Sequence, residues 1–458
     1  MVGSRREGPA ASPARGGFAF RLPGPSTLSP RLRWLLALCA IGVHLTLLFV
    51  YWFPEPKQLA GDENNYLEAG ARILQGQPAD LDLLWPPLYP HLLAWVWSLG
   101  GDVWTVQLGQ TLLLCAVAWL WRDLTLRVVG SGLAADWVAF GLLAYPPLVA
   151  FAHYLWPEVP HLFLATCAAW IVARDRGSIT WMIALGVCLG LAMLMKTLLL
   201  FFVPVLLIPS VAREGFRLRG WIRAGVAMGV ATLVVLPVVA RNWREHRLPV
   251  VAEPVLFNLW VGLNDRAPGS VDVPTVIPEY NAYVASSRDS LERRRVLAAR
   301  IQALLRERGP WLLAERAWIQ YRRLFHRDSF LTDQLPGGEM RQQYQGTPSW
   351  LTGAIRLVCY GSYAALLVLA VAGVASVSSW PGWLRIALAF IAYNLAIFLL
   401  LHVKTRYRLQ MVPVLLLFAG LFVERVWRAR GIGGLFSRGR ALSAAAIALL
   451  LLGLAFVD

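Results

Sequence analysis

Long apolar runs separated by short polar segments dominate the pattern of this chain. A run of roughly 17–25 apolar residues is long enough for a helix to cross a membrane. About eleven runs reach or approach that length, so the pattern predicts an all-α polytopic membrane protein. The predicted spans are 34–53, 103–121, 133–152, 155–173, 179–195, 197–212, 222–240, 351–376, 383–402, 409–427 and 441–457.

The segments between these runs divide the chain into four parts. Residues 1–32 are rich in Pro, Gly, Ser and Arg without apolar periodicity, which predicts a disordered cytoplasmic arm. Residues 33–240 form a first transmembrane module, whose first outer loop is 54–102. A long polar segment, 241–350, is predicted as an extracytoplasmic loop domain, and 351–458 as a second transmembrane module.

Composition agrees with this assignment and excludes other classes. The chain is 57% hydrophobic and only 15% charged, whereas a soluble protein has about 25% charged residues. The net charge of +16 would indicate nucleic acid in a soluble protein. Here the short connections predicted to be cytoplasmic are rich in arginine and the short outer ones are nearly bare, as the positive-inside rule expects, while the long Arg-rich segment 241–350 is exempt from the rule. We therefore expect a bacterial plasma (inner) membrane protein with a cytoplasmic N-terminus, membrane lipids around it and no nucleic-acid partner.

The first outer loop carries the first candidate chemistry. Asp62 and Glu63 open an amphipathic helical segment and are the candidate catalytic acids. Asp62 is either a helix cap or a general base at the mouth of a cavity, and Glu63 points elsewhere on the helix. A proline-punctuated apolar segment around Tyr89 follows. It is too short to span a membrane, so we expect an interfacial helix with Tyr89 at headgroup level.

A second cluster lies on the same predicted side. Lys404, Arg406, Tyr407 and Arg408 precede the penultimate span, where the positive-inside rule disfavours cations. Arginine and lysine suit a phosphate oxyanion. The cluster is therefore a candidate for donor phosphate, with binding to anionic lipid headgroups as the alternative.

Two isolated charges accompany these clusters. Lys196 stands between two apolar runs and either pairs with a carboxylate or a phosphate or extends to the membrane surface. Glu158 lies at the outer boundary of another run, where an acid at a helix N-terminus is also favoured by the helix dipole.

The first outer loop carries a base, and the basic strip of Lys404 to Arg408 suits a phosphate. Both are predicted to face outward, and one reaction uses both. A sugar on a polyprenyl phosphate is transferred to an acceptor hydroxyl that Asp62 activates. One base and one phosphate leaving group imply direct displacement with inversion. The acceptor would be a cell-envelope glycan, lipid or protein. Beyond Asp62 and Glu63 the sequence has no compact ligand set, so no metal ligands and no cofactor are assigned, and a divalent metal stays open.

These residues resemble the GT-C membrane glycosyltransferases, in particular the protein O-mannosyltransferases and the ArnT-like aminoarabinose transferases. The resemblance covers most of the chain and implies a GT-C-like fold, Asp62 as base and Arg406 with its neighbours as phosphate contacts. The charged residue that aminoarabinose transferases carry before their prolines is replaced here by Leu84-Trp85, so aminoarabinose is not carried over. The matching features are Asp62-Glu63 with Tyr66, Pro86 to Pro90 with Tyr89, Glu158, Lys196, Arg241-Asn242, Asn258 to Asn264 and Arg406-Tyr407-Arg408.

Two other functions remain as alternatives. The first is a transporter or flippase of lipid-linked sugars, although such carriers place ionisable residues near the bilayer midplane. The second is a non-catalytic scaffold in which Asp62 is only a helix cap. Substitution of Asp62 by Asn separates the three, because only an enzyme loses sugar transfer while keeping donor binding.

Overall fold

The computed structural model describes residues 28–52, 59, 62–79, 81–264, 273–339, 344, 346–399, 401–432 and 435–456. The predicted arm up to residue 27 lies outside these residues. Helix α1 begins at Pro30, within the segment predicted as the arm.

Six helices in the described part of the chain are long and apolar enough to cross a membrane. A seventh span is formed if two helices that are bent by 53° count as one. The bend falls at Tyr145, because the prolines that follow it disfavour a helical conformation there. The protein is therefore an integral membrane protein. The long helices are α1 (Pro30–Trp52), α4 (Val103–Val129), α10 (Leu218–His246), α16 (Ser349–Ser376), α18 (Val412–Ala429) with the preceding 3₁₀ turn η2 (Thr405–Met411), and α19 (Arg438–Phe456); the bent pair is α5 (Gly132–Ala144) and α6 (Pro146–His153).

The expected count of eleven spans is not confirmed. Four of the predicted spans correspond to helices of fewer than 18 residues, which are short for crossing a membrane. They are α7 (Glu158–Arg174), α8 (Ile179–Met195), α9 (Val203–Arg213) and α17 (Gly382–Ile397). The run 197–212 shows the reason. Its first residues form the 3₁₀ turn η1 (Thr197–Leu199), which leaves α9 only 11 residues. A helix of that length covers about 16 Å of a hydrocarbon core about 30 Å thick.

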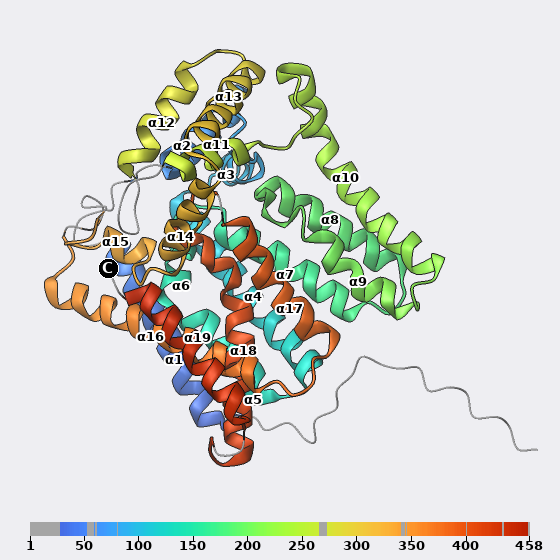
Figure 1. Cartoon of the computed structure of the whole chain (residues 1–458), viewed down its shortest axis with the longest axis vertical. Helices are drawn as coiled ribbons and strands as arrows, with labels where there is room; N and C mark the ends of the chain where they lie inside the picture. The colour runs from blue at the N-terminus through green and yellow to red at the C-terminus, as the bar shows by residue number, and fades with distance from the viewer. Residues whose placement is uncertain are drawn as a thin grey trace, which may run out of the picture.

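The two segments predicted as outer loops meet at one end of the molecule, which we call the capped end (Figure 1). Asp82 of the first segment accepts hydrogen bonds from Arg293 and Tyr280 of the second, both at 2.8 Å. Tyr89 is fully buried inside the protein, and its expected place at headgroup level stays a prediction. The helices of these segments are α2 (Asp62–Leu74), α3 (Leu88–Ser98), α11 (Pro254–Asn264), α12 (Val273–Ala285), α13 (Ser290–Arg308), α14 (Trp311–Phe325) and α15 (Phe330–Gln334).

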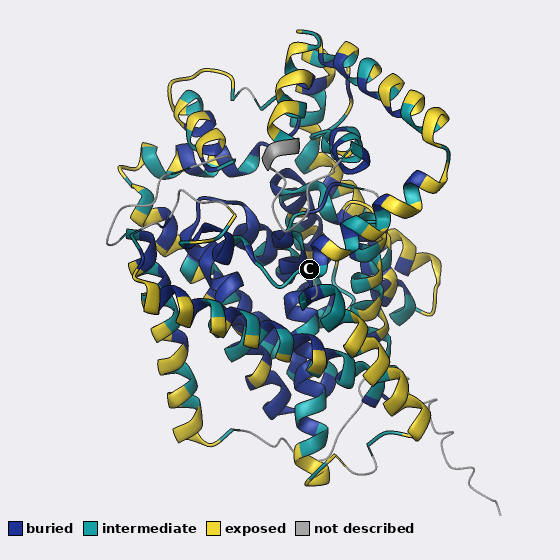
Figure 2. Cartoon of the chain, turned by 60° about the vertical axis from the view of Figure 1, so that its left-hand side comes forward, coloured by how far each residue is buried: buried dark blue, intermediate teal, exposed yellow. Residues whose placement is uncertain are grey.

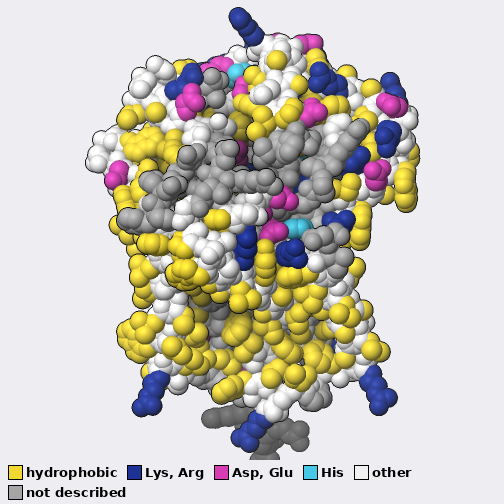
Figure 3. Space-filling model, turned by 90° about the vertical axis from the view of Figure 1, so that its left-hand side faces the viewer, with side chains coloured by type: hydrophobic (Ala, Val, Ile, Leu, Met, Phe, Trp, Pro, Cys, Tyr) yellow, Lys and Arg dark blue, Asp and Glu magenta, His cyan; other side chains and the backbone are white. Residues whose placement is uncertain are grey.

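Beyond the capped end, apolar side chains cover the visible face of the bundle, and Lys or Arg side chains reappear at the opposite end (Figure 3). Several arginines there belong to ion pairs with buried acids. Asp136 contacts both Arg33 and Arg122 at 2.8–2.9 Å. Arg223 pairs with Asp175, which is itself buried. These arginines therefore also connect helices, in addition to any effect on orientation.

Buried residues lie at the centre of the bundle (Figure 2). Many large apolar side chains are exposed on its outer faces. Small residues set one close contact, between α8 and α10. A Cβ at Gly186 would lie 2.6 Å from the carbonyl oxygen of Ala227, and one at Gly190 would lie 2.6 Å from Cβ of Val234. Glycines four residues apart let two membrane helices approach in this way. This contact holds α10 against α8, whose other side packs on α7.

Candidate active site

Helix α2 begins at Asp62, so Asp62 and Glu63 both lie in its first turn. Glu63, Tyr66 and Gly70 share its buried side, at the spacing of one helical face. This side packs against α3. Asp62 is therefore held at the start of an anchored helix rather than on a free loop.

Arg406 reaches Asp62 from the opposite end of the sequence. It lies in η2, a 3₁₀ turn that gives way to α18 at Val412. Its Nη2 donates a hydrogen bond of 2.8 Å to Oδ2 of Asp62. The candidate base and the candidate phosphate-binding arginine are thus in direct contact.

A second ion pair lies beside the first. Glu158 opens α7, and Lys196 follows the last residue of α8 in an extended conformation. The Nζ of Lys196 donates to Oε1 of Glu158 at 2.7 Å. The same oxygen lies 3.7 Å from Nε of Arg406. Asp62, Arg406, Glu158 and Lys196 therefore form one chain of alternating charges, which we call the charge cluster.

The cluster controls the protonation of Asp62. Burial alone would raise the pKa of this carboxyl group, but attraction to Arg406 and Lys404 and the Arg406 hydrogen bond outweigh it and lower the pKa. Asp62 is therefore ionised at neutral pH. An ionised carboxylate can accept a proton only after its tight cationic partner is drawn elsewhere.

Several polar atoms of the cluster have no hydrogen-bond partner in the described part of the chain. They are Nε and Nη1 of Arg406 and Oε2 of Glu158, and all three are buried. Leaving a buried polar atom unpaired costs about 1–3 kcal/mol, and more for a charged group. Two donors and one acceptor in one place suit a ligand that presents an oxyanion and a hydroxyl group.

Glu63 faces away from the Asp62–Arg406 contact. It is fully buried, and its Oε1 accepts the backbone N–H of Leu155 at 3.1 Å. The carboxylate thus fixes the connection between α6 and α7. This geometry favours positioning over proton transfer.

Tyr66 of the acidic motif and Tyr89 of the proline-rich segment pack against each other. The rings of Tyr66 and Tyr89 meet edge to face, 5.2 Å apart. The hydroxyl of Tyr89 donates to Gln110 at 3.0 Å, and Gln110 in turn donates to the carbonyl of Tyr154. Tyr89 therefore supports the chain beneath the cluster, and Tyr66 lies next to Asp62 on the same helix face.

The basic strip divides between two locations. Lys404 is close enough to lower the pKa of Asp62, and Tyr407 stacks on Phe398 with its ring 5.6 Å from the guanidinium of Arg406. Arg408 instead points into the protein. Its guanidinium donates to the backbone carbonyls of Leu324, His326 and Asp328 and stacks on Tyr363. The structure therefore does not bring Arg408 to the cluster.

Arg241 and Asn242 form only local contacts at the end of α10. Asn242 donates to the carbonyls of Val250 and Val251, which closes the chain reversal after the helix. Arg241 is 3.9 Å from the exposed carboxylate of Glu245. Neither contact reaches the charge cluster.

The described residues contain no group of three His, Cys, Asp or Glu side chains that could hold a metal ion. In the charge cluster, Asp62 and Glu158 are both engaged by cationic side chains. The arrangement as it stands suits an anionic ligand better than a cation.

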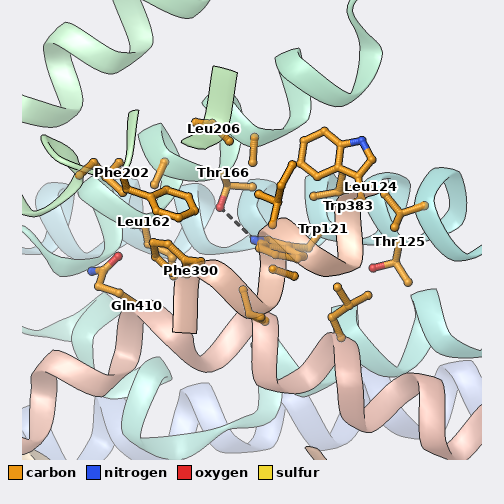
Figure 4. Close-up of a pocket in the computed structure, with 18 residues that line it drawn as sticks. Trp121, Leu124, Thr125, Leu162, Thr166, Phe202, Leu206, Trp383, Phe390 and Gln410 are labelled. Carbon is orange, nitrogen blue, oxygen red and sulfur yellow. Dashed lines mark hydrogen bonds between the residues drawn. The ribbon is translucent and has the colours of Figure 1, made fainter. Parts of the chain in front are cut away.

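An apolar pocket lies between α4, α7, α9, α17 and α18 (Figure 4). Leu162, Phe202 and Phe390 line one end of it, together with Gln410. Gln410 is four residues after Arg406, and its Oε1 lies 3.1 Å from Nδ1 of His161 in α7. The pocket therefore ends one helical turn from the residues of the charge cluster.

Trp156 contacts the charge cluster and was not identified from the sequence motifs. It lies two residues before Glu158, and its ring centroid is 3.7 Å from the guanidinium carbon of Arg406. A tryptophan in an apolar segment has an ordinary role in packing, so composition gives no signal for it. Only its place beside Glu158 in Trp156-Pro157-Glu158 indicates proximity to the site.

Comparison with known proteins gave distant matches only. No family model matches the sequence, and no curated protein matches it. The crystal structure of ArnT from Cupriavidus metallidurans in the apo state matches with 15% identity and a TM-score of 0.39, over 87% of this chain and 78% of ArnT. The same protein bound to undecaprenyl phosphate gives a TM-score of 0.38 at 15% identity, over 87% of this chain and 79% of that one.

A further match is the archaeal oligosaccharyltransferase AglB from Archaeoglobus fulgidus, in complex with an inhibitory peptide and a dolichol-phosphate. It has 14% identity and a TM-score of 0.45, over 93% of this chain and 55% of AglB. All three TM-scores are below 0.5, so the assignment of function rests on the geometry of the site.

Proposed function

We propose that this chain is an inverting glycosyltransferase that moves a sugar from a polyprenyl phosphate to an acceptor hydroxyl. One observation carries the proposal: the carboxylate of Asp62 and the guanidinium of Arg406 are 2.8 Å apart, with Lys404 close by. A group able to take a proton thus lies directly beside groups able to hold a phosphate. Transfer from a phosphate leaving group needs a base at the acceptor hydroxyl and cations at the phosphate, on opposite sides of the anomeric carbon and within reach of one bound sugar.

The reaction follows from these positions. Asp62 takes the proton of the acceptor hydroxyl as its oxygen attacks the anomeric carbon. The bond between that carbon and the phosphate oxygen breaks, and the electron pair leaves with the polyprenyl phosphate. Arg406 and Lys404 stabilise the charge that grows on this oxygen. A single displacement inverts the anomeric configuration.

The unpaired atoms of the cluster support a sugar phosphate as ligand. Nε and Nη1 of Arg406 are free to donate to a phosphate, and Oε2 of Glu158 to accept from a sugar hydroxyl. Lys196 holds the other oxygen of Glu158 and so fixes the direction of the free one. A ligand that forms hydrogen bonds with these atoms removes the free-energy cost of burying them without a hydrogen-bond partner.

A lipid anchor on the donor agrees with the surroundings of the cluster. The cluster lies where membrane helices give way to the capped end, so a phosphate bound there would leave its chain among apolar helices. The pocket that ends at Gln410 offers apolar walls in that direction. A water-soluble sugar nucleotide would gain nothing from such walls.

The arginine pattern supports the rest of the proposal. It favours a cytoplasmic N-terminus, which puts the capped end and the reaction on the extracytoplasmic face of a bacterial plasma membrane. The acceptor would then be a glycan, lipid or protein of the cell envelope.

The test uses the full chain in lipid nanodiscs with a panel of undecaprenyl-phosphate-linked sugars. We expect release of undecaprenyl phosphate with at least one sugar, and a loss of at least about 100-fold in Asp62→Asn, the usual contribution of a general base. Binding of undecaprenyl phosphate should be retained in that variant. Glu68→Gln, which removes an exposed carboxylate from the same helix, is the matched control and should keep its activity.

Two results would contradict the proposal. Full activity in Asp62→Asn would remove the base from the mechanism. Movement of the intact lipid-linked sugar across a vesicle membrane, without release of undecaprenyl phosphate, would favour the flippase alternative.

A further inference from the structure

Trp156 lies in the sharp connection between α6 and α7, and this connection is held from both sides. The backbone N–H of Leu155 donates to Glu63, and the side chain of Gln110 donates to the carbonyl of Tyr154. Trp156 itself is only 3% exposed. Its backbone is therefore fixed independently of its side chain.

The ring of Trp156 is also held at its edges. Phe330, Phe151 and Tyr66 meet it edge to face, with centroids 5.1, 6.2 and 6.4 Å away. Such contacts restrict the rotation of an aromatic ring. Here the face is taken by Arg406, whose guanidinium carbon is 3.7 Å from the ring centroid.

This distance determines how the guanidinium lies. At this height the guanidinium lies over the face of the ring within cation–π range, and flat stacking, as arginine does on aromatic faces, gives it the most contact. The N–H bonds of a guanidinium lie in its plane. They therefore point sideways, parallel to the ring, and Nη2 uses this direction to reach Asp62. Nε and Nη1 point within the same plane and have no hydrogen-bond partner in the described structure.

We propose that Trp156 is a positioning residue for phosphate binding, because its ring fixes the guanidinium plane of Arg406. The inference rests on the proposed function. One hydrogen bond to Asp62 would not hold the arginine in place once a phosphate competes for it. The aromatic platform keeps the plane unchanged while Arg406 exchanges Asp62 for the phosphate, and so keeps its donors aligned when the base is released.

The experiment measures binding of undecaprenyl phosphate, and of undecaprenol as the phosphate-free probe, to the full chain in nanodiscs. Trp156→Leu should weaken binding of undecaprenyl phosphate about 30-fold, the size of a desolvated cation–π contact, and leave undecaprenol binding unchanged. Trp156→Phe keeps an aromatic face and should recover most of the affinity. In turnover, the loss should appear in KM for the lipid donor more than in kcat.

A second tryptophan–arginine pair, away from the charge cluster, provides a matched control. Trp170 also stacks on an arginine, Arg174, at 4.3 Å, away from the charge cluster. Trp170→Leu removes a comparable contact and should leave both probes bound as before. In the background of Arg406→Gln, Trp156→Leu should add little, because a residue that acts through Arg406 has nothing left to position.

The outcomes separate the two proposals. If the wild-type chain binds both probes equally, the phosphate site and hence the proposed function fail. If phosphate preference is present and lost in Arg406→Gln but kept in Trp156→Leu, only the role of Trp156 is overturned. Should Trp156→Leu fail to fold, Trp156→Met takes its place, and equal affinity of the Met, Phe and wild-type chains would overturn the role as well.

Discussion

Asp62 and Arg406 are 344 residues apart in the sequence and share a hydrogen bond of 2.8 Å. The contact joins the first helix of the capped end to the turn before α18. It also means that the free protein holds its candidate base in an ion pair. A phosphate that binds Arg406 would release Asp62, so donor binding would precede activation of the acceptor.

The pH dependence of activity should report this contact. Arg406 and Lys404 lower the pKa of Asp62 against the opposing effect of burial. The base therefore stays ionised, and the ion pair stays intact, until the pH falls through the lowered pKa. In Arg406→Gln, burial is opposed only by the remaining cations, so the pKa rises and the acid limb of kcat/KM moves to higher pH.

This shift is measured from the pH profile of undecaprenyl phosphate release. Glu68→Gln should leave the acid limb where it is, since Glu68 is exposed. An unmoved limb in Arg406→Gln, at measurable activity, would show that Asp62 does not control the rate.

Arg406 and Arg408 should separate binding from stability. Arg406→Gln should reduce affinity for undecaprenyl phosphate, because it removes a charged donor to the ligand. Arg408→Gln should instead lower the free energy of unfolding by about 2 kcal/mol or more, which is seen as a lower thermal unfolding temperature. Its loss leaves the backbone carbonyls of Leu324, His326 and Asp328 without their donor. Equal loss of phosphate affinity in both variants, at equal stability, would place Arg408 in the binding site after all.

Isolated charge was the most informative signal in the sequence. Asp62, Glu158, Lys196 and Arg406 stand out because an ionisable residue near apolar runs is costly unless it has a partner or a function. Their pairing could not be predicted, because it depends on how α2, α7, α8 and η2 are packed. Arg408 shows the limit of this signal. It adjoins Arg406 in the sequence, but side chains two residues apart leave a helical turn in different directions.

The helical class was predictable for a different reason, because long apolar runs have few alternatives to a helix in a membrane. The number of spans was not. Apolar residues that form the turn η1 or the bend at Tyr145 look the same in composition as those inside a span. Trp156 escaped notice for a similar reason, since its function depends on a partner 250 positions later in the sequence.

The Glu158–Lys196 pair should respond unequally to removal of its two partners. Lys196→Met leaves Glu158 with Arg406 at 3.7 Å, whereas Glu158→Gln leaves the charge of Lys196 without its 2.7 Å partner. Breaking a buried ion pair costs about 3–5 kcal/mol. We expect Glu158→Gln to reach this range and Lys196→Met to cost less.

Thermal unfolding in nanodiscs measures both effects. The double variant Glu158→Gln/Lys196→Met should be more stable than the sum of the single losses predicts, because it leaves no unpaired charge. Strict additivity would mean that the two side chains do not interact in the membrane.

Glu63 provides the sharpest contrast with its neighbour. Glu63→Gln keeps an oxygen that can accept the N–H of Leu155, so the connection before Trp156 stays in place. We therefore expect Glu63→Gln to retain most of its activity, whereas Asp62→Asn loses it. Glu63→Ala removes the acceptor, leaves a buried N–H unpaired at a cost of about 1–3 kcal/mol and should raise KM for the lipid donor by loosening Trp156. The measurement is kcat and KM for undecaprenyl phosphate release in all three variants. If Glu63→Gln fell as far as Asp62→Asn in kcat, proton transfer would involve both carboxylates, and the role of Glu63 in holding the α6–α7 connection would not account for its place in the site.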